Sequence, residues 1–303
     1  MKSAKSLVAA ALCAAMLLTG CVYQKQGAFS GEVTAGGGTI AATSVAVMQI
    51  CEQLDLDLVG VPKSALVEIP ERYKAATVVG SPMAPDMEIL AQLHPDWVLS
   101  PNSLQSDLQP KYEAAGLRYG FLNLRTVFGM YQSIADMGKI FDRQKQADAL
   151  VAEFEQFMEQ YHASPQNMPS PRVLVLMGLP GSYVVATENS YVGSLVELAG
   201  ATNVYAGTDA EFLNVNTEDM LQKDPDLILR TAHALPESVM EMFDEEFRTN
   251  DIWKHFSAVQ NDQVYDLPHE SFGMSANFTH PQALEILDGI LFDENLITGG
   301  AAQ

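Results

Sequence analysis

The sequence contains few cysteines and lacks the short motifs that mark the commonest enzyme classes. Only three of its 303 residues are cysteine, at Cys13, Cys21 and Cys51. It has no phosphate-binding Gly-x-x-x-x-Gly-Lys-[Ser/Thr] loop, no Gly-x-Gly-x-x-Gly turn and no Gly-x-Ser-x-Gly nucleophile elbow. Neither His-x-x-x-His nor Cys-x-x-Cys occurs, which argues against a zinc site. A chain without these patterns is more typical of a binding protein than of an enzyme, so we expect no catalysed reaction.

Basic residues are scarce as well. The chain has 17 Lys and Arg against 38 Asp and Glu, a formal net charge of −21. Phosphate backbones and anionic lipid surfaces attract basic proteins and repel acidic ones. The composition therefore argues against a nucleic-acid partner and against a protein that lies flat on a membrane.

The one long apolar run lies at the N-terminus. Lys2 and Lys5 precede apolar residues 7–18, a run too short to span a bilayer, and Leu-Thr-Gly-Cys21 follows. This arrangement predicts a secretory signal over residues 1–20. The Leu-Thr-Gly-Cys ending resembles a bacterial lipobox, which implies acylation of Cys21 and an anchor on the outer face of the cytoplasmic membrane. A plain signal peptide with an incidental cysteine is the alternative.

The segment after the predicted cleavage site has the composition of a tether. Residues 21–38 include Gly36, Gly37 and Gly38 and are predicted to be flexible. If Cys21 carries a lipid such as palmitate, Cys51 has no partner, and we expect no disulfide within the chain. About 265 residues remain, enough for two lobes with separate cores.

One pattern occurs twice in the chain. Residues 86–100 and 216–230 each read as a short helix, a Pro-Asp pair and a buried strand. Aligning them gives five identities, which pair Glu88 with Glu218, Gln92 with Gln222, Pro95 with Pro225, Asp96 with Asp226 and Leu99 with Leu229. The repeat predicts two similar α/β lobes.

The lobes should be joined by one helix. Residues 147–161 carry apolar side chains three or four positions apart, and a proline-rich turn and a new buried strand follow. We therefore predict an N-terminal α/β lobe over residues 39–142, a bridging helix over 143–164 and a C-terminal α/β lobe over 165–303. The predicted fold is two Rossmann-like lobes with the ligand held between them.

Two candidate ligating residues flank the repeats. Met83 precedes the first copy on a turn that contains Gly80, Pro82 and Pro85, and His233 follows the strand of the second copy. Ligands of open α/β sheets bind at the carboxyl ends of the strands. A thioether and an imidazole together form a good axial pair for haem iron. His269, after the last predicted strand, is the rival histidine.

Four segments, taken together, resemble a known family. They are residues 80–85 (GSPMAP), 176–183 (LMGLPGSY), 250–256 (NDIWKHF) and 272–277 (FGMSAN). The chain resembles the haem-receptor lipoproteins of iron-regulated surface determinant (Isd) systems, which are the substrate-binding components of haem-importing ABC transporters. The resemblance implies a class III substrate-binding fold, and it places the axial methionine on Met83 and the axial histidine on His233.

The resemblance also implies further site residues. The family's haem-contacting loops correspond to the regions of Ser44, Val45, Ser64, Gly181, Ser182 and Tyr183. Val45, Pro82, Leu179 and Tyr183 could cover the largely apolar macrocycle. Ala65 stands where relatives can carry an aromatic residue. Glu88 and Glu218 fall where related receptors use one glutamate per lobe to dock on the permease. A carboxylate in the first turn of a helix is also favoured by the helix dipole, which is the plain alternative for both residues.

These inferences converge on an expected function. We expect an extracytoplasmic, lipid-anchored monomer that binds haem and delivers it to an ABC permease, with upstream haem-donor proteins as further partners. A ferric siderophore or a corrinoid as ligand is one alternative, and an exported haem redox protein is the other. Met–His ligation fills both axial positions and so argues against oxygen chemistry. Few Lys and Arg residues lie on the predicted ligand-facing loops, which argues against a siderophore.

Overall fold

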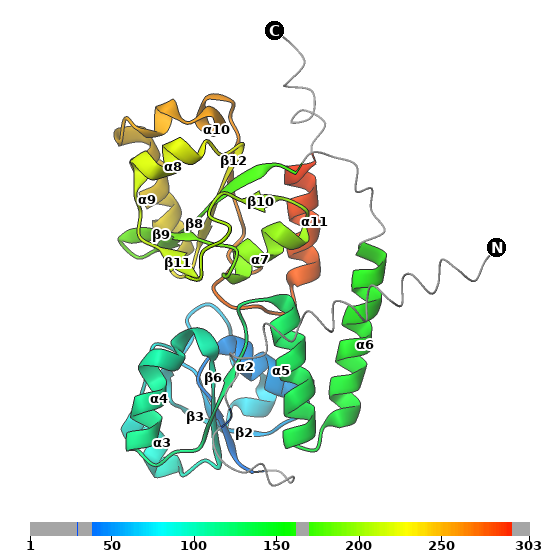
Figure 1. The fold of residues 1–303 in the computed structure, drawn as a ribbon. Helices are drawn as coiled ribbons and strands as arrows, with labels where there is room; N and C mark the ends of the chain where they lie inside the picture. The colour runs from blue at the N-terminus through cyan, green and yellow to red at the C-terminus, as the bar shows by residue number, and fades with distance from the viewer. Residues whose placement is uncertain (1–28, 30–37, 162–169, 293–303) are drawn as a thin grey trace, which may run out of the picture. The chain divides into compact units, whose positions relative to one another are not determined.

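The computed structural model describes residues 29, 38–161 and 170–292. The predicted signal peptide, Cys21, most of the tether and the last three residues of the predicted bridging helix lie outside these residues. The chain divides into two compact units. Met1–Asn123 and Tyr131–Val151 form the N-terminal unit, and Leu124–Met130 and Ala152–Gln303 form the C-terminal unit. Figure 1 labels most of the helices and many of the strands of both units.

The N-terminal unit is built on a parallel sheet with strand order β3-β2-β1-β6-β7. Strands β1, β6 and β7 are buried along their whole length, as expected for a parallel sheet that is covered on both faces. The strands are β1 (Ile40–Ala42), β2 (Leu58–Val61), β3 (Thr77–Val78), β6 (Trp97–Pro101) and β7 (Tyr119–Leu122).

Helices and one small hairpin complete this unit. The hairpin consists of β4 (Gly80–Ser81) and β5 (Ala84–Pro85). The helical elements are α2 (Val45–Gln53), η1 (Glu71–Tyr73), α3 (Met87–Leu93), η2 (Asn102–Leu104), α4 (Gln105–Ala114) and α5 (Val127–Ile140), whose first four residues belong to the C-terminal unit. The sequence patterns did not predict β1 or α4. The first is only three residues long, and the second carries Pro110 and has little apolar periodicity.

The C-terminal unit has a mixed sheet. Its main path is β11-β9-β8-β12-β13, and β10 pairs in parallel with β8. β12 and β13 run parallel to β8, whereas β9 and β11 add antiparallel pairs on the other side. The strands are β8 (Arg172–Leu179), β9 (Ser182–Ala186), β10 (Thr202–Asn203), β11 (Phe212–Leu213), β12 (Leu227–Ala232) and β13 (Val264–Asp266).

The predicted bridging helix is α6 (Gln144–Tyr161), and the division between the two units falls inside it, after Val151. The remaining helices are α7 (Tyr191–Leu198), α8 (Thr217–Lys223), α9 (Pro236–Thr249), η3 (Trp253–His255), α10 (Ser257–Gln260) and α11 (His280–Leu291). No helix in the described part of the chain is both long and apolar enough to cross a membrane.

The helices of the two repeats begin and end alike. Asp86 caps α3 by accepting from the Glu88 and Ile89 amides, and Asn216 caps α8 by accepting from the Asp219 amide. Each helix ends on a left-handed residue, His94 in the first and Asp224 in the second, both with φ 45°.

The Pro-Asp pairs also play the same part in both repeats. The Asp96 carboxylate accepts from the Thr39 amide at 2.8 Å, just before β1. The Asp226 carboxylate accepts from the Arg172 amide at 2.7 Å, at the start of β8. Each aspartate therefore ties the strand of its own repeat to the first strand of its sheet. The repeat seen in the sequence is a repeated structural unit.

Each unit has its own apolar core. In the N-terminal unit the core gathers around Val98, Leu90, Tyr112 and Phe121, all fully buried. In the C-terminal unit it gathers around β8 and β12, with α9 and the Trp253 region packed against them. Separate cores let each unit position its own loops.

Candidate functional site

Three predicted site segments of the N-terminal unit follow neighbouring parallel strands. Ser44 comes two residues after β1, Ser64 three residues after β2, and Met83 five residues after β3. Because the carboxyl ends of parallel strands lie at the same edge of a sheet, the topology brings these segments to one edge.

Ser44 is the N-cap of α2. Its backbone is extended, with φ −135°, and its hydroxyl accepts from the Val47 amide at 3.3 Å. The preceding Thr43 is held by hydrogen bonds to the Leu99 carbonyl and the Ser100 hydroxyl. Amides in the first turn of a helix have no partner inside it, so the start of α2 beside Val45 can receive a carboxylate.

Met83 lies at the tip of the β4–β5 hairpin. Pro82 and Met83 form its two-residue turn, and the Met83 side chain is 68% exposed. Gly80 has φ +98°, and a Cβ there would lie 2.9 Å from both the Ala84 carbonyl and the Asp86 amide. The hairpin geometry therefore requires glycine. A short, braced turn presents the thioether outward, where it can ligate a metal.

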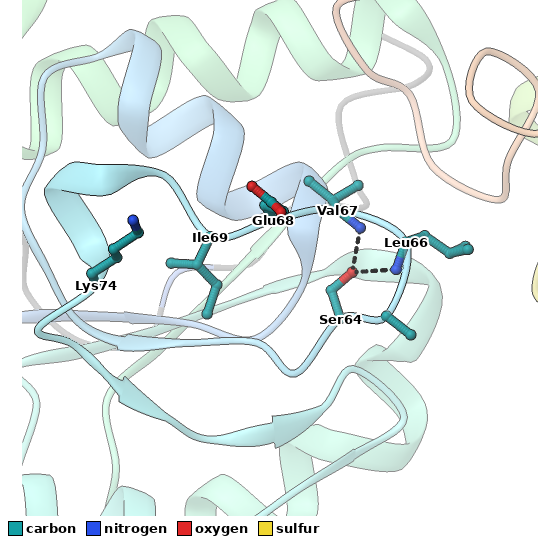
Figure 2. Close-up of a pocket in the computed structure, with 7 residues that line it drawn as sticks. Ser64, Leu66, Val67, Glu68, Ile69 and Lys74 are labelled. Carbon is teal, nitrogen blue, oxygen red and sulfur yellow. Dashed lines mark hydrogen bonds between the residues drawn. The ribbon is translucent and has the colours of Figure 1, made fainter.

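Hydrogen bonds within the loop that carries Ser64 stabilise its conformation (Figure 2). The Ser64 hydroxyl accepts from the Leu66 amide at 3.3 Å and from the Val67 amide at 3.0 Å. The Lys63 amide donates to the Gly80 carbonyl at 2.8 Å, which joins this loop to the Met83 hairpin. Both accepting positions of the hydroxyl are occupied, so its remaining capacity toward a ligand is to donate.

Figure 2 also shows a surface pocket formed by this loop. Its volume is about 460 Å³, and it is lined by Ser64, Ala65, Leu66, Val67, Glu68, Ile69 and Lys74. Leu66 and Val67 are both exposed apolar side chains, and Lys74 is paired with Glu71. Ala65 contributes only a methyl group to this lining, and the adjacent Leu66 and Val67 supply most of its apolar surface.

In the C-terminal unit, His233 directly follows β12. Its amide donates to the Gly178 carbonyl at 2.9 Å, which extends the β8–β12 pairing by one residue. Burial lowers the pKa of His233 below its usual value. The neutral imidazole is the form that ligates iron, so its surroundings favour ligation.

The rival histidine, His269, follows β13, the strand next to β12 in the sheet. Its Nδ1 lies 3.3 Å from a Glu270 carboxylate oxygen. The topology brings both histidines to the same sheet edge, so their partners distinguish them. Among the described residues the His233 ring makes no hydrogen bond or ion pair, whereas the His269 ring faces the Glu270 carboxylate.

Gly181 and Ser182 lie at the turn between β8 and β9, and both are exposed. Tyr183 follows on β9 and is tied into the unit. Its hydroxyl donates to Glu246 at 3.0 Å, and its ring packs against Phe243 at 5.4 Å between centroids.

Glu246 holds more than Tyr183. The same carboxylate oxygen accepts from Asn250 at 2.9 Å and from the Trp253 indole at 3.1 Å. Burial acts to raise the pKa of Glu246, but these hydrogen bonds outweigh it and keep the pKa below its usual value. Glu246 is therefore ionised at neutral pH and fixes the Tyr183 ring, which can contact a ligand only through the part left exposed.

The two predicted docking residues are exposed in equivalent first turns. Glu88 lies in α3 and Glu218 in α8. Glu88 accepts from Gln92 at 3.3 Å. The neighbour of Glu218, Asp219, accepts from the Tyr205 hydroxyl at 2.6 Å, which ties α8 to the body of its unit.

Within the described residues there is no cluster of three or more His, Cys, Asp or Glu side chains able to hold a metal ion. The candidate ligands are instead one methionine from the N-terminal unit and one histidine from the C-terminal unit. Sequence reasoning did not predict the exposure of three apolar residues on or near the site loops, Leu66, Val67 and Leu235. Their exposure is a tertiary property, and an apolar residue in a sequence ordinarily predicts burial.

Comparison with known proteins gives consistent similarities. A family model described as periplasmic binding protein matches residues 40–271. The chain is 38% identical over 281 residues to the high-affinity heme uptake system protein IsdE of Staphylococcus aureus strain Newman, covering 92% of this chain and 94% of that protein.

Two solved structures are similar over most of this chain. The S. aureus IsdE structure complexed with heme has a TM-score of 0.80 and 39% identity, covering 85% of this chain and 100% of that one. An ABC transporter substrate-binding protein from Listeria monocytogenes EGD-e has a TM-score of 0.79 and 44% identity, covering 85% and 99%.

Proposed function

The chain belongs to the periplasmic binding protein family, and from that premise we propose that it captures haem outside the cytoplasm and delivers it to an ABC permease. The observation that carries the proposal is Met83, a methionine 68% exposed at the tip of a braced hairpin. Methionine usually fills gaps in an apolar core, and an exposed methionine gains little from packing. Its thioether can instead serve as a ligand for haem iron. The similarity to IsdE along nearly the whole chain supports the same function.

Met83 and His233 are the proposed axial ligands, one from each unit. With both axial positions of the iron filled, no coordination site remains for oxygen, so the arrangement suits transport rather than catalysis. The neutral His233 imidazole supplies the nitrogen ligand, and its lowered pKa keeps that nitrogen available in mildly acidic solution.

The remaining predicted site residues can contact both the charged propionates and the apolar macrocycle of haem. The propionates can meet the amides at the start of α2 beside Ser44 and the hydroxyl proton of Ser64. Val45, Pro82, Leu179 and the exposed part of Tyr183 can cover the apolar macrocycle. Gly181 and Ser182 offer backbone groups at the β8–β9 turn.

Delivery requires a second set of features. Cys21, as a lipidated N-terminus, would hold the protein at the outer face of the cytoplasmic membrane. Glu88 and Glu218 would orient it on the permease, since each projects from the first turn of a repeated helix. Haem-donor proteins would supply the ligand.

Titration of the purified protein with hemin tests the proposal. We expect saturation at one haem per chain and the absorption spectrum of a six-coordinate, low-spin haem. Met83→Ala and His233→Ala should each weaken binding or change the spin state, whereas His269→Ala should do neither. A wild-type protein that binds a ferric siderophore or a corrinoid and not hemin would refute the proposal. If His269→Ala alone loses the six-coordinate spectrum, the assignment of His233 is wrong.

A further inference from the structure

Leu235 departs from the local rules of its position in three ways. It is the N-cap residue of α9, yet its side chain forms no capping hydrogen bond. Its backbone is left-handed, with φ 46° and ψ 57°, and its side chain is 59% exposed. N-caps favour Ser, Thr, Asp and Asn, and left-handed backbone favours Gly, Asn and Asp.

The other residues with positive φ show how unusual this one is. Six non-glycine residues in the described part of the chain have positive φ, and four of the other five are aspartate. The fifth is His94, so all five belong to residue types enriched in this conformation. Leucine has no polar atom that could offset the steric conflict of its Cβ with the backbone. Leu235 is therefore the outlier of the set.

The structural role of this position depends on its backbone and not on its side chain. The Leu235 carbonyl accepts from the Val239 amide at 3.0 Å, which is the first regular bond of α9. Val239 and Phe243 bury the helix in the core, and Pro236 suits its first turn. Asparagine or glycine would satisfy the same backbone with less strain. A residue type that is unfavourable for its backbone conformation and brings no structural benefit points to a functional site.

The location of Leu235 indicates what it contacts. Only Ala234 separates it from His233, whose amide is fixed to the Gly178 carbonyl. An exposed apolar side chain two positions along the chain from the proposed axial imidazole matches the apolar face of a porphyrin. We propose that Leu235 is an apolar contact to the haem macrocycle beside His233. The inference rests on the proposed function and adds an apolar contact residue to that site.

Two substitutions separate this role from a structural one. Leu235→Asn and Leu235→Gly both relieve the backbone strain, so the melting temperature of the haem-free protein should stay equal or rise. Both also remove the apolar contact, so hemin should dissociate about tenfold faster, in keeping with the loss of a buried leucine contact. Leu235→Met keeps an apolar side chain and should retain most of the affinity.

Asp224→Gly is the matched control. Asp224 is another residue with positive φ in the same unit, at the end of α8. Glycine there should raise the melting temperature and leave the rate of hemin dissociation unchanged.

Two outcomes would overturn the inference. The first is a Leu235→Asn protein that melts at a lower temperature, which would make Leu235 a structural residue. The second is a Leu235→Asn protein that releases hemin at the wild-type rate but transfers it poorly to permease-containing vesicles. That result would make the Leu235 side chain a contact to the permease. A wild-type protein that does not bind hemin would refute the proposed function itself, and the inference with it.

Discussion

Arg230 shows how the strand that carries His233 is held in place. The guanidinium lies on β12 and is almost fully buried, yet all of its charge is matched. It forms two hydrogen bonds to Asp266, at 2.6 and 2.8 Å, and a third to Asp244 at 3.0 Å. Its carbon lies 5.5 Å from the centroid of the Phe243 ring and 5.0 Å from that of Phe247. A buried charge satisfied in this way fixes β12 to β13 and α9 three residues before the proposed ligand.

Removing one of its partners should therefore be costly. Asp266→Asn should lower the free energy of unfolding by about 1–3 kcal/mol, because a paired, buried guanidinium loses charge-assisted hydrogen bonds. Urea unfolding at neutral pH measures the loss. Asp251→Asn breaks the exposed pair with Lys254 and should change nothing measurable. Equal effects from the two substitutions would contradict the account.

The titration of His233 gives a prediction with a definite sign. Burial lowers its pKa in the folded state below the value of about 6.5 for an unfolded chain. As the pH falls below 6.5, the unfolded chain takes up this proton before the folded one, so this residue's contribution to stability falls with decreasing pH. The His233 imidazole should remain neutral, and hemin affinity should persist, somewhat below pH 6.5. NMR titration of the ring protons measures this, and a pKa at or above 6.5 would contradict it.

At the scale of elements, the hairpin β4–β5 and the loop 63–69 behave as one assembly. The bond from the Lys63 amide to the Gly80 carbonyl joins them, and the Ser64 hydroxyl fixes the loop. Together they place Met83, Leu66 and Val67 as exposed apolar side chains after adjacent strands. Short, internally bonded turns lose little entropy when a ligand binds, which favours affinity.

Gly80→Ala tests whether this assembly positions Met83. The new Cβ would lie 2.9 Å from backbone atoms of the hairpin in a left-handed conformation, so the hairpin has to shift. We expect a loss of about 2–3 kcal/mol of stability and a weakened methionine band in the haem spectrum. Gly116→Ala is the control, because it has φ +67° with no atom within 4 Å of the new Cβ. Its cost should be about 1 kcal/mol, with an unchanged spectrum.

At the scale of the whole molecule, the acidic surface bears on delivery. A net charge of −21 leaves few cations, so specific carboxylates must act within a generally negative surface. Glu88 and Glu218 are distinguished by their position, since the repeat places each in the first turn of an equivalent helix. Charges at the rim of an interface act mainly on encounter rate and orientation.

The double variant Glu88→Gln with Glu218→Gln should therefore leave hemin affinity intact and slow haem transfer into permease-containing liposomes. The effect should be largest at low salt, where screening is weakest. The double variant Glu153→Gln with Glu155→Gln removes the same charge from exposed positions on α6 and should transfer haem normally. Unchanged transfer in the first variant at low salt would leave Glu88 and Glu218 with only their helix-dipole role.

Much of this protein follows from local sequence signals. Caps, the Pro-Asp pairs and short apolar runs are read within a few residues, so the repeat, the α/β class and the places of Met83 and His233 after strands were predictable. In the structure Met83 lies on the turn of the β4–β5 hairpin and His233 directly follows β12, as the sequence predicts. These features could be predicted because each signal acts on residues close to it in the sequence.

Tertiary structure alone decided the rest. The bond between Tyr183 and Glu246 joins residues 63 apart in sequence, and the pairing of Arg230 with Asp266 joins residues 36 apart. No local pattern specifies such partners. Leu235 goes further, because its residue type favours burial and negative φ whereas the fold gives it exposure and positive φ. The packing of β12 and α9 sets that backbone against local preference, so only the folded chain shows it.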